Sequence, residues 1–255
     1  MNRVIAAGLL AGAAVVVRDA GACSCMPPEA ALLAPDRVDD APVNAKVRIE
    51  VPSYAGAAAP LLRVHGGADV PVTTRKIAGG DLDVIELTPA APLAPSTQYE
   101  VATIDRSRHP PVHVLGTFKT GAATSDTTAP RFDRLGPPVT SRPGANAMSS
   151  SCGVPGPWVT FDDVALTDPG RPDAQLFIGV WLGDASGKID DTKPPARLLR
   201  ASRGSLVLGK SSLCMPHDFA FPASAHAWLG LAPIDEAGNA GALRKVKVDL
   251  KAGKP

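Results

Sequence analysis

Alternating apolar and polar residues predict three neighbouring β-strands in the first half of the chain, over Asp83–Leu87, Gln98–Ile104 and Val112–Thr120. These runs are rich in Val, Ile, Thr, Tyr and Phe, which suit a pleated and half-buried surface. Because successive side chains of a strand point to opposite faces, a period of two gathers apolar residues on one side. The residues expected to share a face are Tyr99, Val101 and Thr103 in the second run, and Val112, Val114, Gly116 and Phe118 in the third.

The connection between the first two runs, Thr88–Thr97, contains three prolines. Proline fixes φ and lacks an N–H, so this connection is expected to be extended rather than helical. Leu93 stands in its middle and is expected to plug the core beneath it.

Further strand-like runs continue the pattern on both sides. The 175–182 run is apolar on both of its faces, which is typical of a central strand covered on both sides. We expect one short helical turn at Glu29–Leu33 and a long Pro/Gly/Ser-rich loop at Gly136–Gly156. The other strands are expected at 47–51, 61–64, 70–76, 131–135, 158–161, 205–208, 219–221, 226–234 and 243–250.

One set of positions spans the central runs: Ile85, Leu87, Pro89, Pro92, Leu93, Pro95, Thr97, Tyr99, Val101, Gly116, Phe118 and Thr120. This pattern, with the preceding Pro42–Ile49 strand, resembles the bacterial Ig-like domain of the S-layer SbsA type over roughly residues 36–120. The resemblance implies a β-sandwich, and such domains serve as spacers, surface modules and binding scaffolds. The Asp235–Asn239 turn (DEAGN) resembles the final hairpin of bacterial Ig-like and fibronectin type III-like modules, which implies a second module.

The chain is therefore predicted to be all-β, with two tandem Ig-like β-sandwiches after an N-terminal signal peptide. At 255 residues it is long enough for two modest domains that each bury a core. The predicted parts are a signal peptide at 1–22, a Cys-x-Cys tail or linker at 23–40, the SbsA-type domain at 41–120, a small, polar linker at 121–130 and the second domain at 131–251.

The N-terminus predicts export. Val4–Val17 is an apolar run after Arg3, and Ala20-Gly21-Ala22 is a small-x-small cleavage site. Cleavage after Ala22 would remove two of the 26 basic and one of the 25 acidic side chains, which leaves 24 of each and no net charge. A neutral chain without a basic stripe argues against nucleic acid as a partner.

Cleavage would place Cys23-Ser24-Cys25 at the mature N-terminus, with three interpretations. The first is a disulfide-bonded tail in an oxidising compartment. The second is lipidation of Cys23, the one route by which we expect contact with a membrane. The third is a resemblance of Cys-x-Cys to the netrin-like metalloproteinase-inhibitor module, in which the terminal amine and the Cys carbonyl chelate a catalytic zinc.

The other two cysteines, Cys152 and Cys214, are expected to pair within the second module. On the chain-entropy estimate, closing that loop would contribute roughly 4 kcal/mol. The competing pairing joins Cys23 and Cys25 to Cys152 and Cys214, and the sequence does not choose between them.

Candidate chemistry in the sequence is sparse. His109 and His113 could share a face, and Cys214 with His217 could bind copper or zinc, but exposed loop histidines and a disulfide are favoured. No serine lies in a Gly-x-Ser-x-Gly elbow or beside a Ser-x-x-Lys pair. Several acidic residues could supply oxygen ligands for calcium, but without a dense Asp-x-Asp loop we expect solvated turns. These residues are Asp162, Asp163, Asp168, Asp190, Asp191, Asp235 and Glu236.

We therefore expect a non-enzymatic, extracytoplasmic protein without cofactor or metal, which acts as a spacer or as a scaffold that binds a protein or a cell-surface glycan. The natural contact surfaces are edge strands and the loops at 106–111, 136–156 and 184–196. The alternative is an inhibitor or metal-binding factor that acts through Cys23-Ser24-Cys25. A third class, a hydrolase, would need a cleft that gathers His217 or His226 with carboxylates.

Overall fold

The computed structural model describes residues 29–36, 38–52, 59–77, 82–104, 109, 111–122, 124–142, 156–172, 174–200, 204–209, 221–222 and 224–251. These residues form strands and no helix, which confirms the all-β prediction. The strands are β1 (Ala31–Ala34), β2 (Val47–Pro52), β3 (Ala59–Val64), β4 (Val72–Ile77), β5 (Leu82–Pro89), β6 (Gln98–Ile104), β7 (Val112–Lys119), β8 (Arg131–Arg134), β9 (Pro138–Ser141), β10 (Trp158–Phe161), β11 (Ala165–Thr167), β12 (Phe177–Leu182), β13 (Arg197–Leu199), β14 (Leu206–Gly209), β15 (His226–Ile234) and β16 (Arg244–Asp249).

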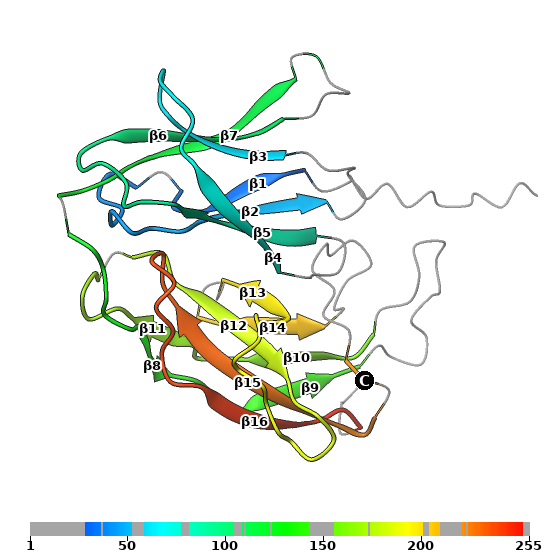
Figure 1. The fold of residues 1–255 in the computed structure, drawn as a ribbon. Helices are drawn as coiled ribbons and strands as arrows, with labels where there is room; N and C mark the ends of the chain where they lie inside the picture. Colours follow the sequence, from blue (N-terminus) through cyan, green and yellow to red (C-terminus); the bar gives the residue numbers. More distant parts are fainter. Residues whose placement is uncertain are drawn as a thin grey trace, which may run out of the picture.

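The first seven strands build one antiparallel sandwich, in the upper half of Figure 1. One sheet has the order β1-β2-β5-β4 and the other the order β3-β6-β7. With the strands lettered A to G in chain order, these are the ABED and CFG sheets of a constant-type immunoglobulin domain. The core between them includes Ile49, Leu62, Leu87 and Val101, and Leu93 from the proline-rich connection is buried against it as expected.

Tyr99 forms the corner that immunoglobulin folds carry at the start of the sixth strand. Its ring stacks on Phe118 with a centroid distance of 5.4 Å. Its hydroxyl oxygen accepts a 2.8 Å hydrogen bond from the backbone N–H of Ala94, five residues upstream. This bond fixes the proline-rich connection across the end of the sandwich.

The alternation predicted for β7 is broken by a bulge. Val101 pairs with Gly116 and Ala102 pairs with Val114, so Leu115 has no opposing residue. An extra residue in one strand reverses the faces of all side chains beyond it. Leu115 therefore packs against the core, whereas Val114 is 46% exposed, and the single apolar face expected from Val112 to Phe118 is wrong.

The segment before residue 41 contains a strand rather than the expected helical turn. β1 pairs with β2 through Leu32 and Ile49, and Leu32 is buried in the first core. The sequence Ala-Leu-Leu-Ala favours a helix locally. At the edge of the sheet, however, β2 offers this segment backbone hydrogen-bond partners and the core offers an apolar surface for Leu32, so the segment forms a strand.

The remaining strands form the second sandwich. A three-stranded sheet, β14-β10-β9, faces a four-stranded sheet, β13-β12-β15-β16, while β8 and β11 form a separate pair. The core includes Phe161, Val180, Leu208, Leu229 and Val248. β9 lies inside the stretch 136–156, which was predicted to be a loop. β11 and β13 were not predicted, because each is only three residues long. The predicted strand at 219–221 lies almost entirely outside the described residues.

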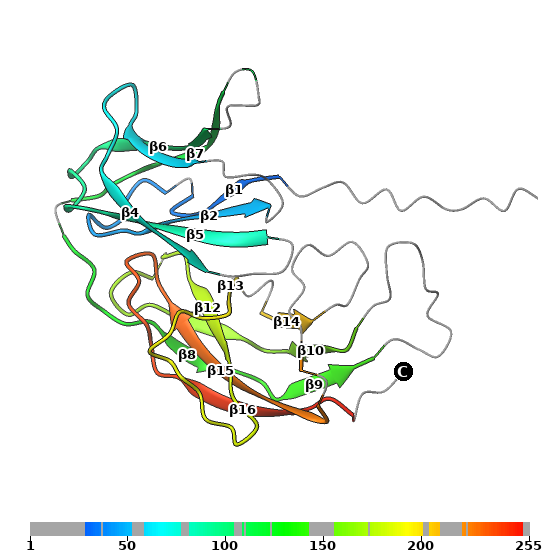
Figure 2. The same cartoon turned by 45° about the vertical axis from the view of Figure 1, so that its right-hand side comes forward.

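The two sandwiches lie against each other through sheets β1-β2-β5-β4 and β13-β12-β15-β16 (Figures 1 and 2). β12 has both faces covered, as predicted. Ile178 and Val180 lie in the second core, while Phe177 and Trp181 lie in a third apolar cluster shared with Val84 of the first sandwich. The described residues include no helix long and apolar enough to cross a membrane.

Replacing Tyr99 with Phe tests the corner. The ring is retained, but the Ala94 N–H loses its acceptor, so the free energy of unfolding should fall by about 1–3 kcal/mol. Urea denaturation followed by tryptophan fluorescence and circular dichroism would measure the loss. A stability equal to that of the wild type would show that water replaces the hydroxyl group and that the corner is not required.

Candidate functional site: the junction between the two sandwiches

The junction has an apolar centre formed by the outer faces of the two sheets. Ala34 and Val84 of the first sandwich pack in one cluster with Phe177, Trp181 and other residues of the second. The indole of Trp181 lies over Gly179, where an added Cβ would come within 2.7 Å of the ring. The Trp181 Nε1–H donates to the carbonyl oxygen of Lys193 at 2.8 Å, which attaches the 184–196 loop to the junction.

A buried arginine crosses the junction beside this apolar centre. Arg48 is 1% exposed, and its Nε lies 3.0 Å from Glu86 Oε2 of the neighbouring strand. Its Nη1 donates across the junction to the carbonyl oxygen of Asp235 at 2.7 Å. The guanidinium also lies 5.4 Å from the ring centroid of Phe177, in a cation–π arrangement. One side chain of the first sandwich thus makes three kinds of contact, two of which reach the second.

Glu86 is held ionised by the basic groups around it. Burial would raise its pKa, but Arg48, Lys46 and Arg75 together outweigh that effect and lower the pKa below the ordinary glutamate value. Arg75 Nη2 lies 2.9 Å from Glu86 Oε1, on the opposite side from Arg48. The three residues are in register across β2, β5 and β4, so the sheet places one carboxylate between two guanidinium groups.

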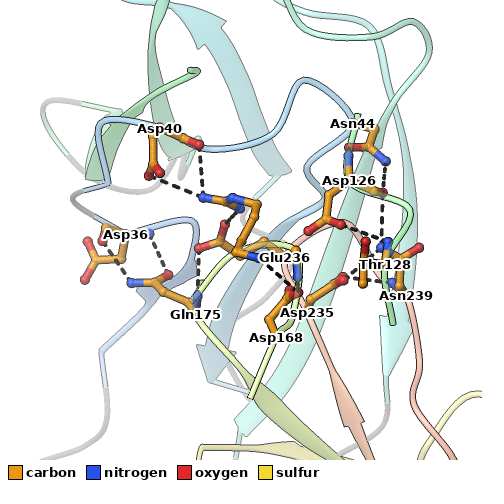
Figure 3. Close-up of polar contacts among 12 residues, drawn as sticks. Asp36, Asp40, Asn44, Asp126, Thr128, Asp168, Gln175, Asp235, Glu236 and Asn239 are labelled. Atoms are coloured by element: carbon orange, nitrogen blue, oxygen red, sulfur yellow. Dashed lines mark hydrogen bonds and ion pairs between the residues drawn. The ribbon is translucent and has the colours of Figure 1, made fainter. Parts of the chain in front are cut away.

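A second polar connection runs through Arg171 and Glu236 (Figure 3). Arg171 Nη1 lies 2.6 Å from Glu236 Oε2, and Arg171 Nη2 donates to the carbonyl oxygen of Asp40 at 3.0 Å. Gln175 makes a reciprocal pair with the backbone of Asp36, with bonds of 2.9 and 3.0 Å. These contacts join the β11–β12 connection to the chain between β1 and β2.

The linker is tied to both sandwiches. The side chain of Asn44 exchanges two hydrogen bonds with the backbone of Asp126, at 2.8 and 2.9 Å. On the other side, Asn239 Nδ2 donates to the same Asp126 carbonyl oxygen at 3.1 Å. The polar, proline-ended composition predicts an interdomain joint, and the fold gives this joint defined partners.

Three buried aspartates gather where the linker meets the second sandwich. Asp126 comes from the linker, Asp168 follows β11 and Asp235 follows β15, and one oxygen of each lies within 4.8 Å of the others. They are 7%, 1% and 0% exposed. Thr128 and Gly170 donate backbone N–H groups to Asp126 Oδ1 and Asp168 Oδ1, at 3.0 and 2.8 Å.

The remaining oxygens of two of these carboxylates have no partner among the described residues. Asp126 Oδ2 and Asp168 Oδ2 are buried and accept no hydrogen bond. Asp235 is different, because Asn239 donates its backbone N–H and its Nδ2 to the two carboxylate oxygens, both at 2.8 Å. Burial, with a smaller effect of Asp126, raises the pKa of Asp235 above the ordinary aspartate value despite these bonds.

Two hollows adjoin the junction. One, of about 390 Å³, is lined by Asp126, Arg171 and Asp40, and so borders the aspartate group at Asp126. The other, of about 210 Å³, lies beside Arg48 and Trp181. Because the donors at the aspartate group are all oxygens, it can hold a hard cation or share protons.

The structure separates the acidic residues considered in the sequence. Asp162, Asp163, Asp190 and Asp191 are exposed, as expected of solvated turns. The same expectation is wrong for Asp168, Asp235 and Glu236, which are buried. Asp126 and Arg48 were not recognised as site residues. Their burial depends on how the two domains and the linker pack. For Asp126 the sequence contains one local signal, a carboxylate inside a linker of small residues.

The other predicted site residues do not meet at the junction. The four cysteines, Cys23, Cys25, Cys152 and Cys214, and His217 lie outside the described residues, so the pairing remains a prediction. The four described histidines are exposed, namely His65, His109, His113 and His226. His226 lies 3.8 Å from the exposed Asp249, and His65 lies 3.5 Å from Glu100.

Comparison with known proteins adds little beyond this geometry. No family model matches the sequence, and no curated protein matches it. The solved fibronectin(III)-like modules of Clostridium thermocellum CbhA match at 9% identity and a TM-score of 0.25, over 89% of this chain and 97% of that one. The tandem Ig repeats of Dlar match at 9% identity and a TM-score of 0.29, over 87% and 98%. The assignment to the class of Ig-like, two-sandwich proteins therefore rests on the strand order.

Replacing Glu86 with Gln should lower the free energy of unfolding at pH 7 by about 3 kcal/mol, because Arg48 is left buried without a counter-charge. The pKa of Glu86 is lowered in the folded state, so its contribution is present above the unfolded-state pKa and is lost as the pH falls through the folded-state pKa. The gap between wild type and variant should therefore shrink below about pH 4.

Urea denaturation at pH 7 and at pH 3 would measure this gap. Glu29→Gln, which changes an exposed carboxylate in the same way, is the matched control and should show no gap at either pH. An equal loss for Glu86→Gln at both pH values would contradict the ion-pair assignment.

Proposed function

We propose that this chain is an exported, non-enzymatic scaffold of the cell envelope or the secreted fraction, in which two Ig-like modules act as one rigid unit. The observation that carries the proposal is the junction itself. Relative motion is the usual expectation for tandem domains, unless their interface is large and apolar. Here an apolar cluster, the buried Arg48 and a hydrogen-bonded linker all join the modules.

The use of the buried ionisable groups supports a mechanical role. Arg48, Glu86, Arg171 and Glu236 all make contacts within or across the junction. Enzymes more often place such groups in a cleft together with a nucleophile or a base. These four buried charges hold elements together, and the described histidines are at the surface.

The partner of such a scaffold would be a protein or a cell-surface glycan, bound at edge strands and loops. Val114 on the edge strand β7 and Val139 on the edge strand β9 are 46% and 51% exposed, and such edges can pair with an added strand. Of the loops proposed as contact surfaces, 184–196 is partly committed to the junction through Lys193, which leaves its exposed tip at 184–186 for a partner. The resemblance to SbsA-type domains, which are spacers and surface modules, points to the same role.

Small-angle X-ray scattering on the full chain tests the rigid unit. The wild type should scatter as one compact particle with a single interdomain arrangement. Trp181→Ala should broaden the distribution of distances without loss of β-sheet circular dichroism, because it removes an apolar group from the centre of the junction. Leu182→Ala, at the exposed next position of the same strand, should scatter like the wild type. Broad scattering by the wild type would contradict the proposal.

The intact mass of the exported protein, before and after reduction, tests the compartment and the terminus. Two disulfides would make the unreduced protein lighter by two hydrogen pairs, and cleavage after Ala22 would fix Cys23 as the first residue. A diacylglyceryl mass would mean a lipoprotein. Free thiols at Cys23 or Cys25 that bind zinc would favour the alternative inhibitor or metal-binding role. A protein retained in the cytoplasm with its first 22 residues would contradict export.

A further inference from the structure

The aspartate group at the junction has more buried negative charge than its surroundings neutralise. None of Asp126, Asp168 and Asp235 forms an ion pair with a described residue. Arg171 and Arg48 are close enough to act electrostatically on Asp126 and Asp235, but each makes its ion pairs with other carboxylates. Arg171 pairs with Glu236 and Asp40, and Arg48 and Lys46 both pair with Glu86. Buried carboxylates without a counter-charge are strongly unfavourable unless they bind a cation or a proton.

Two of these carboxylates also present orphaned oxygens. Asp126 Oδ2 and Asp168 Oδ2 belong to side chains more than nine-tenths buried and have no hydrogen-bond partner in the described structure. Their other oxygens are held by the backbone N–H groups of Thr128 and Gly170, so the orientation of each carboxylate is fixed (Figure 3). Buried acceptor oxygens that have a fixed orientation and no hydrogen-bond donor are the arrangement expected of the ligands of a cation.

We propose that Asp126, Asp168 and Asp235 bind a calcium ion at the junction. Two oxygens on one Ca²⁺ can be at most about 5 Å apart, because each Ca²⁺–O distance is about 2.3–2.6 Å. One oxygen from each aspartate meets this limit, since all three lie within 4.8 Å of one another. Asp235 already accepts two bonds from Asn239, but each carboxylate oxygen keeps a second lone pair for a metal.

The donor set favours calcium over other metals. Zinc and copper prefer sites with nitrogen or sulfur donors, and this group offers carboxylate oxygens alone. Magnesium requires near-octahedral geometry with distances close to 2.1 Å, whereas calcium accepts a looser shell completed by water. The 390 Å³ hollow borders the group at Asp126, which is the side from which a cation and its water would enter.

The ligands come from three separate parts of the chain, so the ion would act on the junction as a whole. Asp126 is in the linker, and its backbone is bonded to Asn44 of the first sandwich and Asn239 of the second. A bound ion would hold the linker against the ends of β11 and β15. The site stands independently, and only its role in holding the modules rigid rests on the proposed function.

Isothermal titration of CaCl₂ into the full chain, previously dialysed against a chelator, tests the site. We expect one equivalent to bind, with a rise in the melting temperature that excess chelator reverses. Asp168→Asn should weaken calcium binding at least about tenfold, since it removes one charged ligand. Asp162→Asn, which changes an exposed aspartate in the same way, should bind as the wild type does.

A second measurement guards against a variant that merely fails to fold. Without calcium, Asp168→Asn should melt at or above the wild-type temperature, because it removes one of three mutually repelling charges. A variant that is destabilised without calcium and binds as tightly as the wild type would overturn the proposal. So would a wild type that shows neither binding heat nor a rise in melting temperature at millimolar calcium, or one that binds MgCl₂ equally well.

Scattering separates this inference from the proposed function. Calcium binding with no change in wild-type scattering supports the ion site, while broad scattering at saturating calcium contradicts the rigid scaffold and leaves the site intact. Broad scattering in chelator that becomes compact with calcium would support both.

Discussion

The outer face of sheet β1-β2-β5-β4 carries Arg48 and Glu86 in register on neighbouring strands, and the second sandwich covers that face. Burial removes both charges from water, so they are stable only as a pair with their remaining hydrogen-bonding groups satisfied. Glu86 is satisfied within its own module by Arg75, whereas Arg48 needs the Asp235 carbonyl and the Phe177 ring. The first module is therefore complete only with the second in place, which makes the relative placement of the modules specific.

Apolar and polar contacts make different contributions to this junction. The cluster around Trp181 and Phe177 supplies burial, which is favourable but tolerates small rotations. The bonds from Arg48, Arg171 and Asn44 have narrow distance and angle requirements, so they select one arrangement. The aspartate group lies where the linker, β11 and β15 converge, and that convergence produces its excess of negative charge. A calcium ion there would turn repulsion between three chain segments into attraction.

Local pattern was sufficient for most of the fold. The period of two found β6 and β15 with their exact ends, and β2 and β5 to within one or two residues at each end. The apolar residues on both faces of β12 correctly indicated a strand that is covered on both sides. These strands are long enough to show alternation and rest on their own cores. β11 and β13 were missed because three residues carry almost no periodic signal. β1 was missed because Ala-Leu-Leu-Ala favours a helix locally, and β9 because it lies in a Pro/Gly/Ser-rich stretch. The bulge at Leu115 was missed because it is set by the pairing with β6.

The sequence by itself determined that apolar and polar side chains alternate with the period of β-strands, that two groups of strands follow each other, and that Asp235–Asn239 forms a turn. Alternation and turn chemistry act over a few residues, so they can be read from the chain alone. Only the tertiary structure decided that Asp126, Asp168 and Asp235 meet, and that Arg48 is buried. The three aspartates are separated by tens of positions and meet because the linker and the ends of β11 and β15 converge, whereas Arg48 is buried because the two modules pack face to face. The burial of a charge is a property of what covers it, and here the cover is the other module.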